Sequence, residues 1–193
     1  MARVLCVALP WFRTERLTRS LDTPQEPELA VVIRRSNTLV LTGVTRSAWR
    51  AGLREGMTLA QARALFPKLE VAFQDDEAEA RTLESLAAFA YAYTPDIRLW
   101  RPNVLLLDIS GSERLHGSEE ALMAKVAGGL QRLGFESHMA TADNATAALT
   151  LAMTREAAQT MSGHGDEVFV DLPLQALRLA DRTARELGDL GVT

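Results

Sequence analysis

The sequence predicts an α+β fold built on a ferredoxin-like β-α-β-β-α-β unit, with a small α/β insertion after the first strand. Two observations predict this class. Outside residues 10–74, short apolar runs and amphipathic segments follow one another in the order of that split unit. Residues 10–74 add a hairpin and short helices that interrupt the order. The pattern implies an antiparallel sheet with two helices on one face, an architecture that many functions share.

Boundary signals define the elements of the first part. Pro10 ends the first strand because proline has no N–H for the ladder. Gly52 is a helix stop, and Thr58 is an N-cap for the helix that Pro67 follows. The expected elements are a strand at residues 3–9, a helix at 13–22, a hairpin of residues 29–34 and 38–44, and helices at 46–57 and 59–66.

The second part is more regular. Ser118 is the expected N-cap and Gly134 the stop of one helix, and either Asp143 or Asn144 caps another. The expected elements are helices at residues 75–94, 118–134, 144–161 and 174–191, and strands at 96–102, 103–110, 135–142 and 168–173. The acidic residues Asp75 to Glu79 are interpreted as a solvated helix start that the helix dipole favours.

Composition and charge limit the classes of function that the protein can have. The single cysteine, Cys6, excludes an intrachain disulfide framework and a multi-cysteine zinc site, which fits a reducing cytoplasm. The apolar runs are too short to span a bilayer, so no membrane role is expected. Residues 1–70 carry 11 Lys or Arg against 6 Asp or Glu. This arginine-rich part either contacts phosphate or is an ordinary solvated face.

Four segments together resemble the Y-family (translesion) DNA polymerases. LCVALPWFRTE at residues 5–15 lies over that family's first-strand motif of two aspartates, paired aromatics and a glutamate. GVTRSAWRAGLREGMTLAQARALFP resembles the fingers segment, and YTPDIRLWRPNVLLLDIS resembles the strand pair that carries an Asp-Glu pair. MATADNATAALTLA resembles the segment at the next helix. The matches run in order from residue 3 to about residue 155.

The resemblance implies a division of the chain. Residues 1–9 and 75–163 would form a palm-like domain, residues 10–74 a fingers-like insertion, and residues 164–193 the beginning of a helical thumb-like region. Members of the family continue beyond a thumb, so the chain is expected to be the N-terminal part of a longer protein. No cofactor is expected.

The catalytic residues of the family are replaced here. Its first two aspartates fall on Cys6 and Ala8, and its Asp-Glu pair falls on Asn103 and Val104. Mg²⁺ requires hard oxygen ligands, and this set cannot provide them. Asp108 matches an aspartate that the family does not use for metal, and capping of the Ser110-Gly111 turn is its expected role.

The nucleotide contacts of the family are also replaced. Its fingers tyrosine falls on Arg46 and its fingers arginine on Trp49, while its palm lysine falls on Leu149 or Thr150, according to the alignment. Four arginines of the insertion are candidates for DNA binding: Arg46, Arg50, Arg54 and Arg63. The alternative is that they form an ordinary solvated helix face. Trp49 is a candidate anchor for a protein partner, because tryptophan is enriched in interface hot spots.

A palm that has lost its carboxylates resembles the ImuB-type, non-catalytic members of the family. The resemblance implies an adaptor in bacterial damage-induced mutagenesis. Its partners would be an error-prone C-family DNA polymerase, a RecA-like accessory protein and the sliding clamp, with DNA as a further candidate. Two alternatives stay open. The chain could be a divergent active polymerase with a rearranged metal site, or a DNA-binding module.

Overall fold

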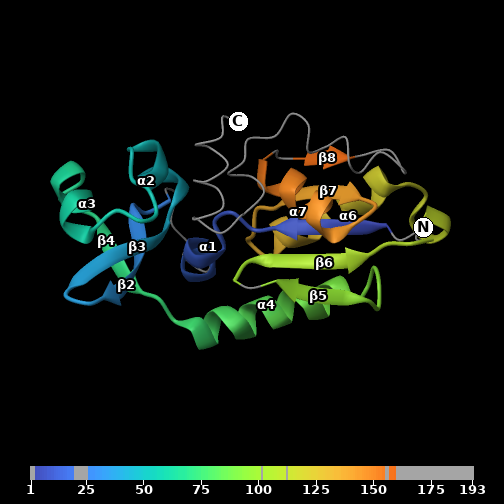
Figure 1. Cartoon of the computed structure of the whole chain (residues 1–193), viewed down its shortest axis with the longest axis horizontal. Helices are drawn as coiled ribbons and strands as arrows, with labels where there is room; N and C mark the ends of the chain where they lie inside the picture. Colours follow the sequence, from blue (N-terminus) through green and yellow to red (C-terminus); the bar gives the residue numbers. More distant parts are fainter. Residues whose placement is uncertain (1–2, 20–25, 101, 112, 155–156, 160–193) are drawn as a thin grey trace, which may run out of the picture.

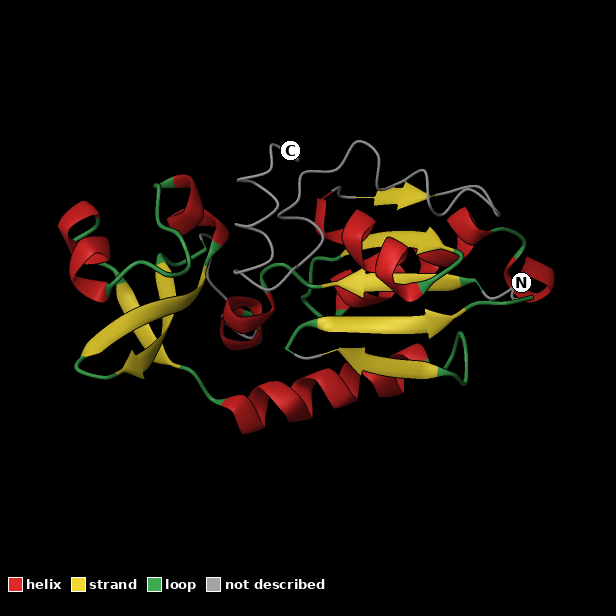
Figure 2. Ribbon diagram, in the orientation of Figure 1, coloured by secondary structure: helices red, strands yellow, loops and turns green. Residues whose placement is uncertain are grey.

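Two β-sheets organise the chain, and Figures 1 and 2 show them side by side. The structure is a computed structural model that describes residues 3–19, 26–100, 102–111, 113–154 and 157–159. The predicted strand at residues 168–173, the predicted helix at 174–191 and the thumb-like region lie outside these residues. Among the described helices, none is both long enough and apolar enough to cross a bilayer.

The larger sheet has the strand order β5-β6-β1-β7-β8. Its strands are β1 (Val4–Ala8), β5 (Ile97–Trp100), β6 (Val104–Asp108), β7 (His138–Ala142) and β8 (Ala157–Gln159). β1 lies in the middle and pairs antiparallel with both β6 and β7. In chain order, β1, the helix α4 (Asp76–Ala90), β5, β6, the helix α6 (Glu119–Arg132) and β7 form the predicted β-α-β-β-α-β unit.

Helices cover both faces of this sheet. The helices of the described chain are α1 (Phe12–Thr18), α2 (Arg46–Arg50), α3 (Leu59–Leu65), α4 (Asp76–Ala90), α5 (Glu113–His116), α6 (Glu119–Arg132) and α7 (Ala145–Thr154). α4 and α6 pack on one face, where Leu5 and Val7 of β1, and Leu9 just after it, join the main apolar core. α7 packs on the opposite face against β1 and β7. β1 is therefore buried on both sides.

The smaller sheet has the order β3-β2-β4, with β2 (Leu29–Arg35), β3 (Thr38–Val44) and β4 (Glu70–Phe73). A tight turn at Ser36 and Asn37 joins β2 to β3, and Ser36 has a positive φ of 52°. The predicted hairpin is confirmed. β4 was not predicted, and it pairs in parallel with β2.

The predicted caps are confirmed. Thr58 and Gln61 form a capping box at the start of α3, and Ser118 accepts a hydrogen bond from the Ala121 N–H. Asn144, one of the two candidates, caps α7 by accepting from the Ala147 N–H at 2.9 Å. Gly134 has a φ of 82° just after α6, which only glycine adopts without strain.

Three predicted boundaries were wrong. The helix expected over residues 144–161 ends at Thr154, and the short strand β8 follows and extends the sheet beside β7. The helices expected over residues 75–94 and 46–57 end at Ala90 and Arg50, and α5 was not predicted. The alanines at residues 157 and 158 favour helix locally, but their pairing with β7 overrides that preference.

The helix α1 connects the two sheets. Phe12 lies in the main core and stacks on Phe135 at a centroid distance of 5.9 Å. Arg13 donates to the Glu79 carboxylate at 3.2 Å and to the Thr42 carbonyl of β3 at 2.7 Å. Glu79 is only 4% exposed, so the interpretation of this acid as solvated was wrong. Its burial is compensated by Arg13.

Candidate functional site

The positions that match the family's catalytic acids lie next to one another on β1 and β6. In the antiparallel register Ala8 pairs with Val104, and Cys6 pairs with Leu106. The side chains of Cys6, Ala8 and Val104 are all in the apolar cluster beneath α7, and none is more than 2% exposed. These three residues therefore form part of a dry helix–sheet interface.

Asn103 lies at the end of the same strand pair. Its side-chain amide donates to the Leu9 carbonyl at 2.8 Å, and the Leu9 N–H donates to the Asn103 carbonyl at 3.0 Å. These two bonds extend the pairing of β1 and β6 by one residue. The side-chain amide of Asn103 thus stabilises the end of β1 through this hydrogen bond.

The residues of this site do not fit a divalent metal. A two-metal phosphoryl-transfer site needs carboxylates that bridge the ions. Cys6, Ala8 and Val104 carry no oxygen in their side chains, and they are enclosed by apolar neighbours. In the part of the chain that the structure describes, no three His, Cys, Asp or Glu side chains form a cluster that could hold a metal.

Asp108 is at the other end of β6, opposite Val4. Its Oδ1 accepts a hydrogen bond from the Ser110 N–H at 2.8 Å, which confirms the predicted turn-capping role. Hydrogen bonds from the side chain and backbone of Ser110 lower the pKa of Asp108 below its ordinary value. The carboxylate is therefore structural, and it is separated from Cys6 and Ala8 along the sheet.

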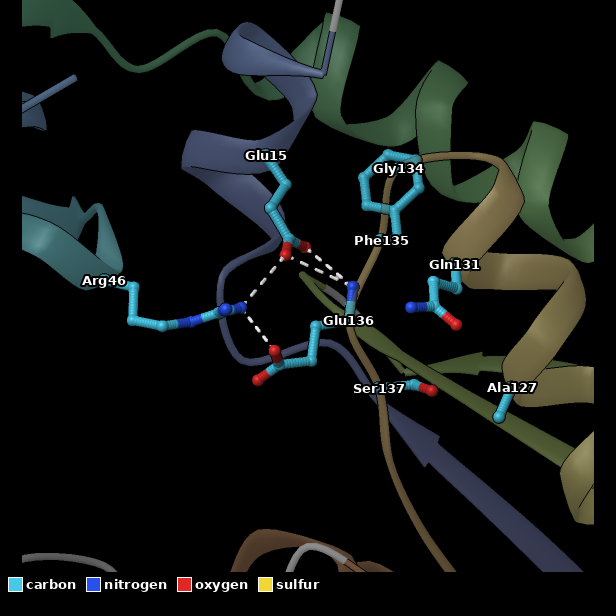
Figure 3. Close-up of a pocket in the computed structure, with 8 residues that line it drawn as sticks. All are labelled: Glu15, Arg46, Ala127, Gln131, Gly134, Phe135, Glu136 and Ser137. Atoms are coloured by element: carbon cyan, nitrogen blue, oxygen red, sulfur yellow. Dashed lines mark hydrogen bonds and ion pairs between the residues drawn. The ribbon is translucent and has the colours of Figure 1, made fainter. Parts of the chain in front are cut away.

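Arg46 links α2 to α1 and to the segment between α6 and β7. Its guanidinium pairs with the Glu136 carboxylate, and the same nitrogen lies 3.8 Å from the Glu15 carboxylate. Glu15 in turn accepts from the Glu136 N–H at 3.2 Å. Figure 3 shows these three residues on one side of a pocket of about 360 Å³, with Gln131 on the other side. We call Arg46, Glu15 and Glu136 the clasp.

Two tryptophans extend the clasp. The Trp11 ring lies under the Arg46 guanidinium at 5.7 Å, and its Nε1–H donates to Glu136 at 3.1 Å. Trp49 packs edge to face against Trp11 at 6.1 Å, and Arg54 stacks over Trp49 at 4.5 Å. Cationic side chains and aromatic rings thus stack in a row from Arg46 to Arg54, with the two tryptophans between them. Each such contact is favourable by about 0.5–2 kcal/mol.

The proposed DNA-binding arginines therefore differ in their surroundings. Arg46 faces carboxylates, and Arg54 donates to the Trp49 and Leu53 carbonyls at 2.6 and 2.7 Å. Arg50 in α2 and Arg63 in α3 are exposed. Trp49 is 45% exposed despite its ring contacts, so one face of it remains accessible to a partner.

Burial gives Glu15 an unusual titration. Desolvation raises its pKa to about 7, and the nearby Glu136 carboxylate adds to the effect, whereas the Glu136 N–H and Arg46 oppose it. The pKa of an unfolded glutamate is about 4.3. The folded protein thus binds more protons than the unfolded chain between those two values, so Glu15 lowers the free energy of unfolding as the pH rises through this window.

Replacing Glu15 with glutamine should remove this fall in the free energy of unfolding at high pH. The introduced amide stays neutral at every pH and can still accept from the Glu136 N–H. We expect Glu15→Gln to have a higher free energy of unfolding than the wild type at pH 8, by about 1–3 kcal/mol, and a similar one near pH 4.5. Urea denaturation at both pH values measures the difference. The exposed Glu77→Gln is the control and should change stability by less than about 0.5 kcal/mol. An unchanged pH dependence in Glu15→Gln would contradict the assignment.

Sequence reasoning did not find the clasp. Glu136 is 90 residues from Arg46, and it precedes a strand with no local feature that marks it. Glu15 carried a signal, because it matches a glutamate in the first-strand motif of the Y-family. Its partners, however, come from distant segments, and only the tertiary structure reveals them.

Comparison with known proteins identifies the family. A family model described as impB/mucB/samB matches residues 19–154. Protein ImuB from Caulobacter vibrioides is 34% identical over 142 residues, which is 73% of this chain and 31% of that protein. The chain therefore spans about a third of the length of this curated relative.

Solved structures show the same fold. A binary complex of Dbh DNA polymerase superposes with a TM-score of 0.83 at 14% identity, covering 99% of this chain and 58% of the polymerase. DinB from Sulfolobus solfataricus gives a TM-score of 0.79 at 15% identity, with 99% and 58% coverage. A Y-family polymerase chimera gives 0.81 at 14% identity, with the same coverage. The chain belongs to the impB/mucB/samB family, is similar in sequence to Protein ImuB, and has the fold of the Y-family DNA polymerases.

Proposed function

We propose that this protein is a non-catalytic Y-family polymerase homologue that acts as an adaptor in bacterial damage-induced translesion synthesis. In this role it links an error-prone C-family polymerase, a RecA-like accessory protein and the sliding clamp in the cytoplasm. The chain spans 31% of its ImuB relative, and we propose that the contacts also use regions that correspond to the rest of that protein. We further propose that residues 10–74 act as the fingers-like insertion and residues 1–9 with 75–163 as the palm-like domain.

One observation carries the non-catalytic part of the proposal. The positions that match the family's first aspartates and its glutamate are the buried residues Cys6, Ala8 and Val104. The fourth position, Asn103, uses its amide nitrogen to hold the Leu9 carbonyl. A polymerase stabilises its transition state through metal-bound carboxylates, and an apolar helix–sheet interface cannot do so.

The adaptor part of the proposal is supported by the exposed surface around Trp49. Trp49 is half exposed on the insertion, with Arg54 stacked over its ring. Tryptophan and arginine are the residue types that dominate binding hot spots in protein interfaces. The clasp links α2 to α1 and to the segment before β7, which positions this surface beside the larger sheet.

The test uses the full-length protein in two assays. In primer extension with Mg²⁺ or Mn²⁺, we expect no incorporation above a mock-purified sample, while an active Y-family polymerase prepared in the same way extends the primer. Incorporation by this protein would overturn the non-catalytic assignment. Loss of that incorporation in Asp108→Asn would then locate a rearranged metal site.

The second assay measures partners and separates the adaptor from a DNA-binding module. The purified C-family polymerase, RecA-like protein and clamp are each tested for capture by the full-length protein, and we expect capture that weakens in Trp49→Ala. Exposed Arg50 and Arg63 favour the alternative of DNA binding. Salt-sensitive DNA binding at about 50 mM salt, without capture of any protein, would support that alternative instead.

A further inference from the structure

An apolar strip of the larger sheet is left open on the face that carries α7. α7 packs on β1, β7 and β8. Figure 1 shows it in front of the middle of the sheet, with β5 at the outer edge. Beside α7, the side chains of Val4, Leu106 and Ala145 border a groove of about 510 Å³. The described residues therefore leave the β5–β6 side of this face uncovered.

The register shows which backbone groups of β5 point outwards. The Asp108 N–H donates to the Asp96 carbonyl at 3.0 Å, so this pair is a hydrogen-bonded one. Such pairs alternate along an antiparallel ladder, so Arg98 and Trp100 also bond to β6, whereas Ile97 and Leu99 turn their N–H and C=O groups away from it. Within the described chain, no hydrogen bond engages those outward groups.

The side chains beside this edge define a recognition pattern. Ile97 and Leu99 pack against the main core, so Asp96, Arg98 and Trp100 alternate onto the groove side. Trp100 is 50% exposed and forms an apolar wall of the groove. Asp96, Asp108 and Asp143 line the groove together with the cation Arg98. The groove thus combines an apolar floor with an excess of negative charge.

We propose that β5 and this groove bind an extended segment of a partner protein, which adds to the sheet as a further strand. The outward N–H and C=O groups of Ile97 and Leu99 pair with its backbone. An apolar side chain of the segment enters the groove beside Trp100, and a lysine or arginine faces Asp96. Strand addition at an open edge uses main-chain bonds for affinity and side-chain pockets for specificity.

Charge distinguishes this partner from other occupants. The lining has three aspartates against one arginine, and Asp143 and Asp96 pair with Arg3 and Arg98, so the remaining negative charge disfavours nucleic acid. A second copy paired about a two-fold axis at Arg98 is disfavoured, because that register places two arginines directly opposite each other. A segment that alternates apolar and basic residues can pair with the β5 edge and also complement the groove. The proposal is independent of the non-catalytic role, since it concerns a different surface.

The test selects from a displayed library of random peptides of about ten residues, the upper length of an ordinary strand. The bait is the full-length protein. We expect enriched peptides that alternate apolar residues with lysine or arginine. A synthetic peptide of the enriched sequence should bind at least about tenfold more weakly to Trp100→Ala and to Asp96→Lys, because each change removes one recognised feature.

Controls and a second readout make the test specific. Phe73→Ala removes an exposed aromatic side chain from β4 of the smaller sheet and should leave the affinity unchanged. Amide hydrogen exchange should slow at Ile97 and Leu99 when the peptide binds. Peptides that bind Trp100→Ala equally well, enrichment of acidic peptides, no enrichment, or unchanged exchange at both amides would overturn the proposal. So would single-stranded DNA binding that Trp100→Ala weakens, or self-association that it abolishes.

Discussion

Cys6→Asp should destabilise the protein by about 3–5 kcal/mol and should not create a metal site. Cys6 is fully buried in the middle of the central strand, beneath the alanines of α7. A carboxylate there loses its hydration without gaining a cation. Its pKa would rise until the group is neutral, and even the neutral acid would compete poorly with the apolar packing.

Urea denaturation of wild type and variant at pH 7 measures this loss. Cys6→Ala is the matched control, because it removes the sulfur without adding charge, and it should cost about 1 kcal/mol. A Cys6→Asp protein of normal stability whose melting temperature rises with Mg²⁺ would contradict the expectation. That result would show that the site can still adopt the geometry of an active polymerase.

Gly129→Ala should destabilise the protein by about 1–3 kcal/mol, whereas the neighbouring Gly128→Ala should stabilise it by up to about 1 kcal/mol. A Cβ at Gly129 would lie 2.1 Å from the ring of Phe89, because this side chain of α4 packs directly on the α6 backbone there. At Gly128 no atom lies within 4 Å of the added carbon. The same chemical change thus has opposite consequences at adjacent positions of one helix.

Thermal denaturation of the two variants provides the measurement. The pair is internally controlled, because both changes improve the helix propensity of α6 by the same amount. Their difference therefore reports the contact with Phe89 alone. Gly129→Ala combined with Phe89→Leu should recover part of the loss if the ring is the obstacle. Equal melting temperatures for the two single variants would show that α4 and α6 can separate without cost.

The sequence predicted the elements whose signals are local. Thr58, Ser118 and Gly134 mark helix ends through their own backbone and side-chain chemistry, and each is at its predicted boundary. The strands β4 and β8 have only four and three residues, and both depend on parallel pairing with an existing strand. Such pairing is non-local, so a window of sequence contains little trace of it.

The candidate site was predictable only through family resemblance. Cys6, Ala8 and Val104 are ordinary core residues by composition, and their significance comes from what the family has in those places. The structure adds that they are neighbours in the register of β1 and β6. The clasp could not be predicted, because Arg46 and Glu136 are far apart in the chain and each resembles an ordinary surface charge.

The central position of β1 has a consequence for synthesis of the protein. β1 ends at Ala8, and its two neighbours, β6 and β7, begin at Val104 and His138. Ribosomes add about 5–20 residues per second, so the first strand waits roughly 5–20 s for its first neighbour. The smaller sheet, complete at Phe73, can form during that interval. A nascent chain would therefore expose the hydrophobic strand β1 throughout this interval, during which a chaperone at the ribosomal exit can shield it.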